Sequence, residues 1–132
     1  MLWRTVEHYY QANKYKGTPY LEIIQSASDP TEAYRLSKKY SEHKRTDWKE
    51  LKLEYMKRGT LQKFIENSDI REILLNTGDN LIIENCDDDV FWGQDVNGIG
   101  DNNMGKILMQ VREYLRQNDK SRIDSTLIEG EQ

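Results

Sequence analysis

Hydrophobic side chains recur along most of this chain at the three- and four-residue spacing of helices that bury one face. The longest such pattern follows Asp47, and its apolar positions are Trp48, Leu51, Tyr55, Met56, Leu61, Phe64 and Ile65. A second pattern, near the end of the chain, has its apolar positions at Met104, Ile107, Leu108, Val111 and Leu115. We therefore expect two helices that begin near residues 48 and 104, in a fold that is mainly α.

Capping signals mark three further helices in the first third of the chain. Thr5 can accept a hydrogen bond at the start of a helix over about 6–15. Pro19 suits the first turn of a second helix, because its fixed φ angle is already helical. Asp29-Pro30-Thr31-Glu32 combines an N-cap, a first-turn proline and a glutamate placed for a capping box. It predicts a third helix that runs to about Ser41.

The second half of the chain alternates helices with segments that lack helical spacing. Ser68 predicts the start of a short helix, and Leu81-Ile82-Ile83 is the best strand candidate because it is short, apolar and β-branched. The stretch 87–103 is rich in Asp, Asn and Gly and predicts a long loop. We expect one compact domain over 1–118, mainly α or at most α+β, with about six helices, one or two short strands and this loop. A polar tail is expected over 119–132.

The charge of the chain argues against one class of partner. Lys and Arg number 19 and Asp and Glu number 23, so the formal net charge is -4. That balance disfavours binding to nucleic acid through bulk electrostatics alone. Basic residues nevertheless gather locally at 35–39 and 43–45. A solvated helix face explains this patch best, and contact with a phosphate group is the alternative.

Three absences in the sequence bear on its cellular setting. No apolar run approaches the roughly 20 residues needed to cross a bilayer, so no membrane contact is expected. The first five residues lead straight into polar sequence without a secretory signal. Cys86 is the single cysteine, which excludes an internal disulfide and a cysteine-based zinc site. These features together predict a cytoplasmic protein.

The first predicted helix carries a candidate polar face. Glu7, Gln11 and Lys14 lie at i, i+4 and i+7, so the three side chains share one side of the helix. Glu7 falls in the first turn, where the helix dipole favours an ionised carboxylate. Spacing alone fits a solvent-facing stripe best, although nearby tyrosines would form an aromatic wall beside these groups. His8 is of a type that is more often packed than catalytic.

The loop 87–103 invites two assignments that its sequence does not support. It fails the EF-hand pattern for calcium, because Ile99 and Lys106 occupy positions that require ligands. Gly100–Lys106 matches the first part of a phosphate-binding loop, yet Ile107 stands where Ser or Thr must hold magnesium. We therefore exclude a nucleoside triphosphatase. A general anion site remains, because glycines let backbone N–H groups approach a phosphate at the start of the last helix.

Four blocks of residues carry a family resemblance. They are Thr5–Lys14, Arg45-Thr46-Asp47-Trp48, Asp89-Val90-Phe91-Trp92-Gly93 and Gly98–Gly105. The first is similar to the Glu-His-Tyr-Phe-Gln-Ala block of the NADAR family, the YbiA-like N-glycosidases, and the others resemble further blocks of that family. They occur in the family's order, and the resemblance extends from Trp3 to Leu115. Any one block alone would be weak, but together they are specific.

The resemblance implies an enzyme that hydrolyses the N-glycosidic bond between a ribose and a base-like group, without a metal or other cofactor. The implied substrates are ribose 5-phosphates of riboflavin synthesis, or ADP-ribose on a nucleobase, including a nucleobase in DNA. Cleavage builds positive charge on the sugar, so the oxocarbenium-like transition state needs a carboxylate. The implied catalytic residues are Glu7 and Asp89. The implied substrate-binding residues are His8, Gln11, Lys14, Trp92, Gly93, Gly98, Gly100, Asn102 and Gly105.

The sequence departs from the family pattern at its start. Family members usually begin with a segment that carries a Phe-Ser-Asn-Phe motif and helps to line the pocket, whereas this sequence opens directly on Met1-Leu2-Trp3. We therefore expect a more open pocket and weaker activity. A non-catalytic module that binds ADP-ribose or a nucleotide is the alternative function. A purely structural helical module would explain the helices but not the loop of Asp, Trp and Gly.

Overall fold

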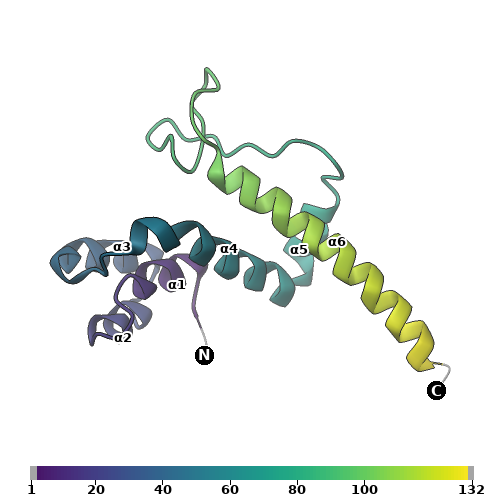
Figure 1. Ribbon diagram of the computed structural model, residues 1–132, viewed down its shortest axis with the longest axis horizontal. Helices are drawn as coiled ribbons and strands as arrows, with labels where there is room; N and C mark the ends of the chain where they lie inside the picture. Colours follow the sequence, from purple (N-terminus) through teal and green to yellow (C-terminus); the bar gives the residue numbers. More distant parts are fainter. Residues whose placement is uncertain (1–2, 131–132) are drawn as a thin grey trace. The chain divides into compact units, whose positions relative to one another are not determined.

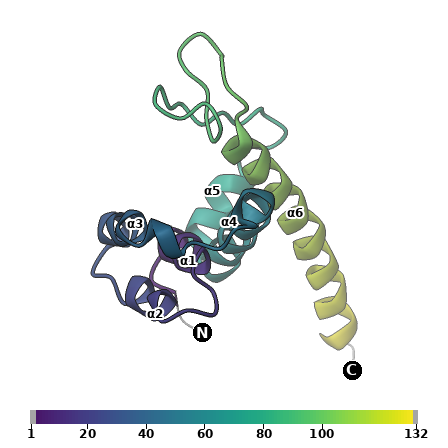
Figure 2. The same cartoon turned by 60° about the vertical axis from the view of Figure 1, so that its left-hand side comes forward.

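The computed structural model describes the backbone of residues 3–130 and the side chains of residues 3–118 (Figure 1; Figure 2). The chain divides into two units, Met1–Lys63 and Phe64–Gln132, which we call the N-terminal and C-terminal units. The helices are α1 (Val6–Asn13), α2 (Tyr20–Gln25), α3 (Pro30–Lys39), the 3-10 helix η1 (Ser41–His43), α4 (Trp48–Glu66), α5 (Ser68–Leu75) and α6 (Asn103–Gly130). The predicted mainly α fold is therefore confirmed, with six α-helices in this described part.

Helices α1 and α3 begin where the sequence predicts. Thr5 precedes α1 with an extended backbone, and its Oγ1 accepts a hydrogen bond from the backbone N–H of His8 at 3.1 Å. Asp29 precedes α3 in the same way, and its Oδ1 accepts from the N–H of Glu32 at 2.8 Å. Each cap satisfies an amide that the start of a helix leaves without an intrahelical partner.

The core of the N-terminal unit lies where α1, α2 and α3 meet. Its buried members are Ala12, Tyr15, Ile24, Ala27, Ala33 and Leu36. Ala12 and Ala33 have no exposed surface, so small side chains stand where α1 and α3 pack together. The hydroxyl of buried Tyr15 donates to the carbonyl of Ser37, which satisfies its polar end inside the core. This packing holds α1, and hence its polar face, in place.

Aromatic rings pack α4 against α1 within the N-terminal unit. Ring centroids lie 5.1 Å apart for Trp48 and Tyr10, and 5.3 Å apart for Trp48 and Tyr55. Tyr55 continues the contact to Tyr9 at 5.9 Å. Gly59 lies inside α4, and a Cβ there would come within 2.9 Å of the ring of Tyr9. The glycine is therefore explained by the close approach of the two helices.

Helices α5 and α6 form the C-terminal unit with the long connection 76–102 between them. The most buried apolar side chains of the two helices are Leu74, Ile107, Val111 and Leu115. The connection arches beyond the first turn of α6 in both views (Figure 1; Figure 2). Helix α6 continues to Gly130, through the residues expected as a tail. Across residues 3–130, no helix combines the length and the apolar character needed to cross a membrane.

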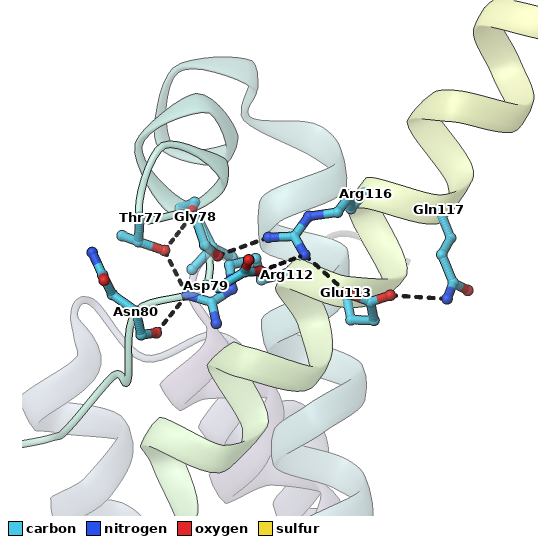
Figure 3. Close-up of polar contacts among 9 residues, drawn as sticks. Thr77, Gly78, Asp79, Asn80, Arg112, Glu113, Arg116 and Gln117 are labelled. Atoms are coloured by element: carbon cyan, nitrogen blue, oxygen red, sulfur yellow. Dashed lines mark hydrogen bonds and ion pairs between the residues drawn. The ribbon is translucent and has the colours of Figure 1, made fainter.

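Two arginines of α6 hold the turn that follows α5 (Figure 3). Arg112 is 7% exposed, and its Nη1 donates to Thr77 Oγ1 and to the carbonyl of Asn80, both at 2.8 Å. One turn later, Nη2 of Arg116 donates to the carbonyl of Gly78 at 2.7 Å. These bonds fasten the start of the connection to the helix in which it ends, so they limit where the loop can lie.

The predicted strand at 81–83 is wrong. The described residues of this region pair only through an isolated bridge between Asn85 and Gln94. The carbonyl of Ile82 instead accepts a hydrogen bond from Asn102 Nδ2 at 2.9 Å, and Leu81 is 71% exposed. An apolar run forms a strand only when a second strand pairs with it, and here a side-chain amide occupies that place.

Candidate active site

The polar face predicted for α1 is formed by Glu7 and Gln11. Gln11 lies one turn after Glu7, and its Nε2 donates a hydrogen bond to Glu7 Oε1 at 2.6 Å. The Gln11 side chain is 4% exposed, whereas Glu7 is half-buried. A short bond from a buried donor fixes the orientation of a carboxylate that solvent can still reach. Such a carboxylate suits a group that faces a developing positive charge.

The other end of the Gln11 amide is buried without a partner. Gln11 Oε1 accepts no hydrogen bond from any group in the described part of the chain. A buried acceptor left in this state costs on the order of 1–3 kcal/mol. A hydroxyl or amino group of a bound molecule would recover that free energy. Because the same amide holds Glu7, such a donor would lie beside the carboxylate.

Lys14 extends this face just beyond the end of α1. Its Nζ lies over the ring of Tyr10, 5.2 Å from the ring centroid. Burial lowers the pKa of Lys14 to about 8, the charge of Lys44 acts in the same direction, and Glu7 opposes both. Near pH 8 the side chain therefore exchanges between a cation and a neutral amine. Groups with such displaced pKa values are enriched at functional sites.

His8 has a structural place rather than the substrate contact that the resemblance implies. It is fully buried, with Nδ1 bonded to Thr5 Oγ1 at 2.8 Å and Nε2 bonded to the carbonyl of Ala27 at 2.9 Å. Because a carbonyl can only accept, Nε2 carries a proton. Both ring nitrogens are thus engaged, and His8 joins α1 to the residue that follows α2. The expected binding role does not fit this geometry.

Asp89, in the C-terminal unit, organises the loop that carries Trp92. Its Oδ1 accepts hydrogen bonds from the backbone N–H groups of Phe91 at 3.0 Å and Trp92 at 2.9 Å. The ring of Trp92 is half-buried and meets Phe91 edge-on, with centroids 4.8 Å apart. The carboxylate is therefore fixed by amides of its own loop. Glu7 belongs to the N-terminal unit and Asp89 to the C-terminal unit.

Four successive backbone N–H groups in the expected phosphate-binding segment, including that of Asn102, are already in use. The donors Asp101, Asn102, Asn103 and Met104 bond to the carbonyls of Val90, Gly93, Phe91 and Trp92 at 2.7, 3.1, 3.2 and 2.9 Å respectively. These amides include the first two of α6, where an anion would otherwise be favoured. The predicted phosphate cradle is therefore not formed by residues 101–104. The same bonds hold the Asp89 turn against the start of α6.

Close packing explains three glycines of this loop. At each of them a Cβ would collide with a backbone carbonyl, and they are Gly93, Gly100 and Gly105. Gly98 has open space around it and a φ of +76°, so it serves a turn instead. Asn102 bridges the 82–84 segment, since its side chain bonds one carbonyl and one N–H there, both at 2.9 Å. The residues expected to hold phosphate thus shape the loop.

Asp95 supports a second turn in the loop. Its Oδ1 accepts hydrogen bonds from the N–H groups of Asn97 and Ile99, both at 2.9 Å. This pattern is an aspartate turn, in which the side chain replaces backbone partners.

Among the side chains described, residues 3–118, no three His, Cys, Asp or Glu gather as a metal site.

Comparison with known proteins places the chain in a family. Residues 1–116 match the NADAR domain. The chain belongs to the NADAR family. An N-glycosidase of Nostoc punctiforme is 44% identical over 117 residues, which cover 86% of this chain and 75% of the relative. The N-glycosidase YbiA of Escherichia coli is 34% identical over 113 residues, which cover 86% of this chain and 71% of that protein.

A solved NADAR-family structure has the same fold. The NMR structure of the E. coli protein YbiA matches with a TM-score of 0.80 and 33% sequence identity, over 89% of this chain and 70% of that one. A riboflavin biosynthesis protein of Vibrio vulnificus is 39% identical over 115 residues, but this chain spans only 31% of that longer protein. The chain therefore has the YbiA fold and is a NADAR enzyme related to N-glycosidases.

Several lysines of this NADAR chain influence Lys14 electrostatically without having been expected to do so. The charges of Lys44, Lys38 and Lys52 all act on Lys14. Lys38 and Lys44 belong to the basic patch at 35–39 and 43–45, for which a solvated helix face is the simplest interpretation from sequence. Lys52 follows the Arg45-Thr46-Asp47-Trp48 block in the family resemblance, but the sequence assigns it no role. These residues become candidates only when the fold brings their segments to the end of α1.

Proposed function

We propose that this chain hydrolyses the N-glycosidic bond between a ribose and a base-like group, with Glu7 as the carboxylate that stabilises the cationic sugar. The observation that carries the proposal is the Glu7–Gln11 pair, in which a buried amide fixes the carboxylate at 2.6 Å. The N-glycosidase names of the relatives support this reaction class. The sugar is the ribose of a ribose 5-phosphate or of ADP-ribose.

The reaction needs a negative group on one side of the sugar. The bond between C1 of ribose and the nitrogen of the base breaks, and its electron pair leaves with the nitrogen, which takes up a proton. C1 becomes oxocarbenium-like, and Glu7 offsets that charge. A water oxygen then bonds to C1 and gives its proton to a carboxylate. Glu7 is half-buried, so its carboxylate remains accessible to solvent water.

Gln11 and Lys14 assist Glu7 from the same face. Gln11 positions the carboxylate through Nε2, and its unpartnered Oε1 accepts a hydrogen bond from a ribose hydroxyl. Lys14, with its pKa near 8, presents an ammonium group to the anionic part of the substrate at neutral pH. Both groups bind the sugar in the orientation that cleavage requires.

The family resemblance also implies a role for the loop of the C-terminal unit. Asp89 is the second carboxylate, held rigid by the two amides that its Oδ1 accepts. Trp92 offers a flat apolar surface for the base. The turns around Gly98 and Asn102 support this surface without holding the phosphate themselves. The phosphorylated substrates and the single Cys86 favour a cytoplasmic setting for the reaction.

The test compares two substrates with one catalytic variant. The protein is incubated with a ribosylaminopyrimidine 5′-phosphate and, separately, with DNA that carries ADP-ribose on a nucleobase. Mass spectrometry then follows the release of ribose 5-phosphate or of ADP-ribose. We expect release from one substrate, and its loss in Glu7→Gln. If calorimetry detects binding of either compound but no bond is cleaved, the chain is a non-catalytic binding module and the proposal fails.

A further inference from the structure

The apolar run that follows the turn after α5 forms no strand, yet its backbone is extended, because every second residue bonds to the same side. The carbonyl of Ile82 accepts from Asn102 Nδ2 and the N–H of Glu84 donates to Asn102 Oδ1, both at 2.9 Å. The carbonyl of Glu84 accepts from the N–H of Gln94 at 2.8 Å, and the N–H of Cys86 donates to the carbonyl of Gln94 at 2.9 Å. This two-residue period is that of a β-strand with one edge filled.

The opposite edge of the run is open. In an extended backbone the intervening residues turn their N–H and C=O groups to the other side, and these residues are Leu81, Ile83 and Asn85. The bridge of Asn85 is made by the groups of its two neighbours, as in parallel pairing. None of the backbone groups of the three is hydrogen-bonded to another residue in the part of the chain that the structure describes. We call this free side the 81–85 edge.

The 81–85 edge is apolar and lies in an acidic segment. Leu81 is 71% exposed and Ile83 is 43% exposed. The stretch 80–105 contains no Lys or Arg. Its carboxylates belong to Glu84, Asp87, Asp88, Asp89, Asp95 and Asp101, and none of them forms an ion pair with a described residue. Natural strand edges are usually protected by lysine, proline or a bulge, and this edge has none of these residues.

These properties favour an extended segment of polypeptide as the occupant. Free N–H and C=O groups in a row pair with such a segment, which adds a strand to the edge. Leu81 and Ile83 would lie on one face and pack against every second residue of the added strand. The intervening residues would lie on the face of Glu84, so its charge and those of Asp87 and Asp88, all exposed, favour Lys or Arg there.

A second copy of this chain fits the edge less well. Pairing of two 81–85 edges would bring the carboxylates of two acidic segments together, with no basic residue of 80–105 between them. Like charges that face each other across paired strands are destabilising. The complementary occupant is therefore basic rather than acidic.

We propose that the 81–85 edge binds an extended segment of another polypeptide, in which apolar residues alternate with lysine or arginine. The added segment pairs with Leu81, Ile83 and Asn85 and completes the strand that the apolar run predicts. Because the run is already bonded to Gln94 and Asn102, the added strand also orders the loop that contains them. The inference is independent of the proposed reaction, since it involves no residue of α1.

The first test follows amide hydrogen exchange of the wild-type protein by NMR. The probe is a capped peptide of roughly seven residues that alternates lysine and valine. The amides of Ile83 and Asn85 should exchange fast in the free protein and at least about tenfold more slowly with peptide. Those of Glu84 and Cys86 are already bonded and serve as internal controls. Unchanged exchange of Ile83 and Asn85 at millimolar peptide would overturn the proposal.

Two altered peptides show which interactions are responsible for binding. Methylation of the central backbone nitrogens keeps the charge and the side chains but removes donors on both edges of the peptide. We expect calorimetry to show at least about tenfold lower affinity. Glutamate in place of lysine should weaken binding by a similar factor, because it meets like charge. Equal affinity of the methylated and the unmethylated peptide would show attraction by charge alone and overturn the pairing.

A substitution in the edge tests the same pairing from the side of the protein. Ile83→Pro removes the central donor and breaks no hydrogen bond that Ile83 makes in the described fold. Peptide affinity should fall at least about tenfold, whereas Ile83→Val, the matched control, keeps the donor and should bind as wild type does. Circular dichroism checks the fold, and the peptide comparisons in wild type decide the matter if the proline variant does not fold. A wild-type dimer that Ile83→Pro converts into a monomer, measured by sedimentation, would place a second copy at the edge and overturn the proposal.

Discussion

Glu7 differs from a glutamine at the same position by its charge far more than by its shape. Glu7→Gln should keep an acceptor for Gln11 Nε2 and lose the negative charge that faces the sugar. We expect kcat to fall by about a hundredfold or more, measured by release of the phosphorylated sugar. The free energy of unfolding should change by less than ~1 kcal/mol, because a first-turn carboxylate contributes little to stability. Wild-type turnover in this variant would remove Glu7 from the mechanism.

A substitution of the neighbouring His8 is expected to lower stability and to leave substrate binding unchanged. His8→Ala removes a fully buried ring and leaves the carbonyl of Ala27 without its donor. The free energy of unfolding should fall by about 2–4 kcal/mol, measured by urea denaturation. The KM of the protein that remains folded should match wild type. A raised KM with unchanged stability would restore the substrate contact that the family resemblance implies.

At the scale of the elements, the sequence correctly predicts features that depend on residues close together in the chain. Thr5 and Asp29 cap α1 and α3 as expected, because a cap depends on residues within three positions. The strand expected at 81–83 fails, since pairing depends on a distant partner that the pattern does not reveal. The Glu7–Gln11 contact is likewise local and predictable. The lysines whose charges act on Lys14 come from three other segments, so only the fold brings them near it.

The glycine loop shows the same limit of prediction from sequence. The spacing of its glycines is compatible with a phosphate cradle, and nothing in the sequence shows that the carbonyls of 90–93 occupy the amides of 101–104. A pattern of glycines indicates where the backbone can adopt unusual conformations. It does not reveal which groups the backbone N–H groups and carbonyls will bond to. Once those partners are known, packing explains the glycines.

Gly105 provides a test of this packing explanation. A Cβ at Gly105 would collide with the carbonyl of Ile82 and the side chain of Asn102, whereas a Cβ at Gly98 would meet open space. Gly105→Ala should lower the free energy of unfolding by about 3 kcal/mol. Gly98→Ala is the control and should cost about 1 kcal/mol, through its positive φ alone. Equal stability losses in urea denaturation would show that contact at Gly105 is unimportant.

At the scale of the whole molecule, the net charge is negative although several positive charges act at the end of α1. The net charge of -4 would repel a phosphorylated substrate at long range. At Lys14, the positive charges of Lys38 in α3, Lys44 in the linker and Lys52 in α4 all act, and the negative charge of Glu7 opposes them. Burial of Lys14, together with the charges of these lysines, opposes folding whenever Lys14 is protonated.

The lowered pKa of Lys14 predicts that the free energy of unfolding depends on pH. Lys14 has a pKa of about 8 in the folded chain and near its ordinary 10.5 when unfolded. Between these values the unfolded chain binds more protons, so the free energy of unfolding rises with pH. Lys14→Met should flatten this rise, and Lys16→Met, at an exposed position, should retain it. The comparison is made by urea denaturation from pH 8 to 10, because burial raises the pKa of Tyr9 above 10.0 and its ionisation at higher pH acts in the opposite direction. Parallel curves for wild type and Lys14→Met would show that Lys14 titrates as an ordinary lysine and that neither its burial nor the nearby positive charges lower its pKa.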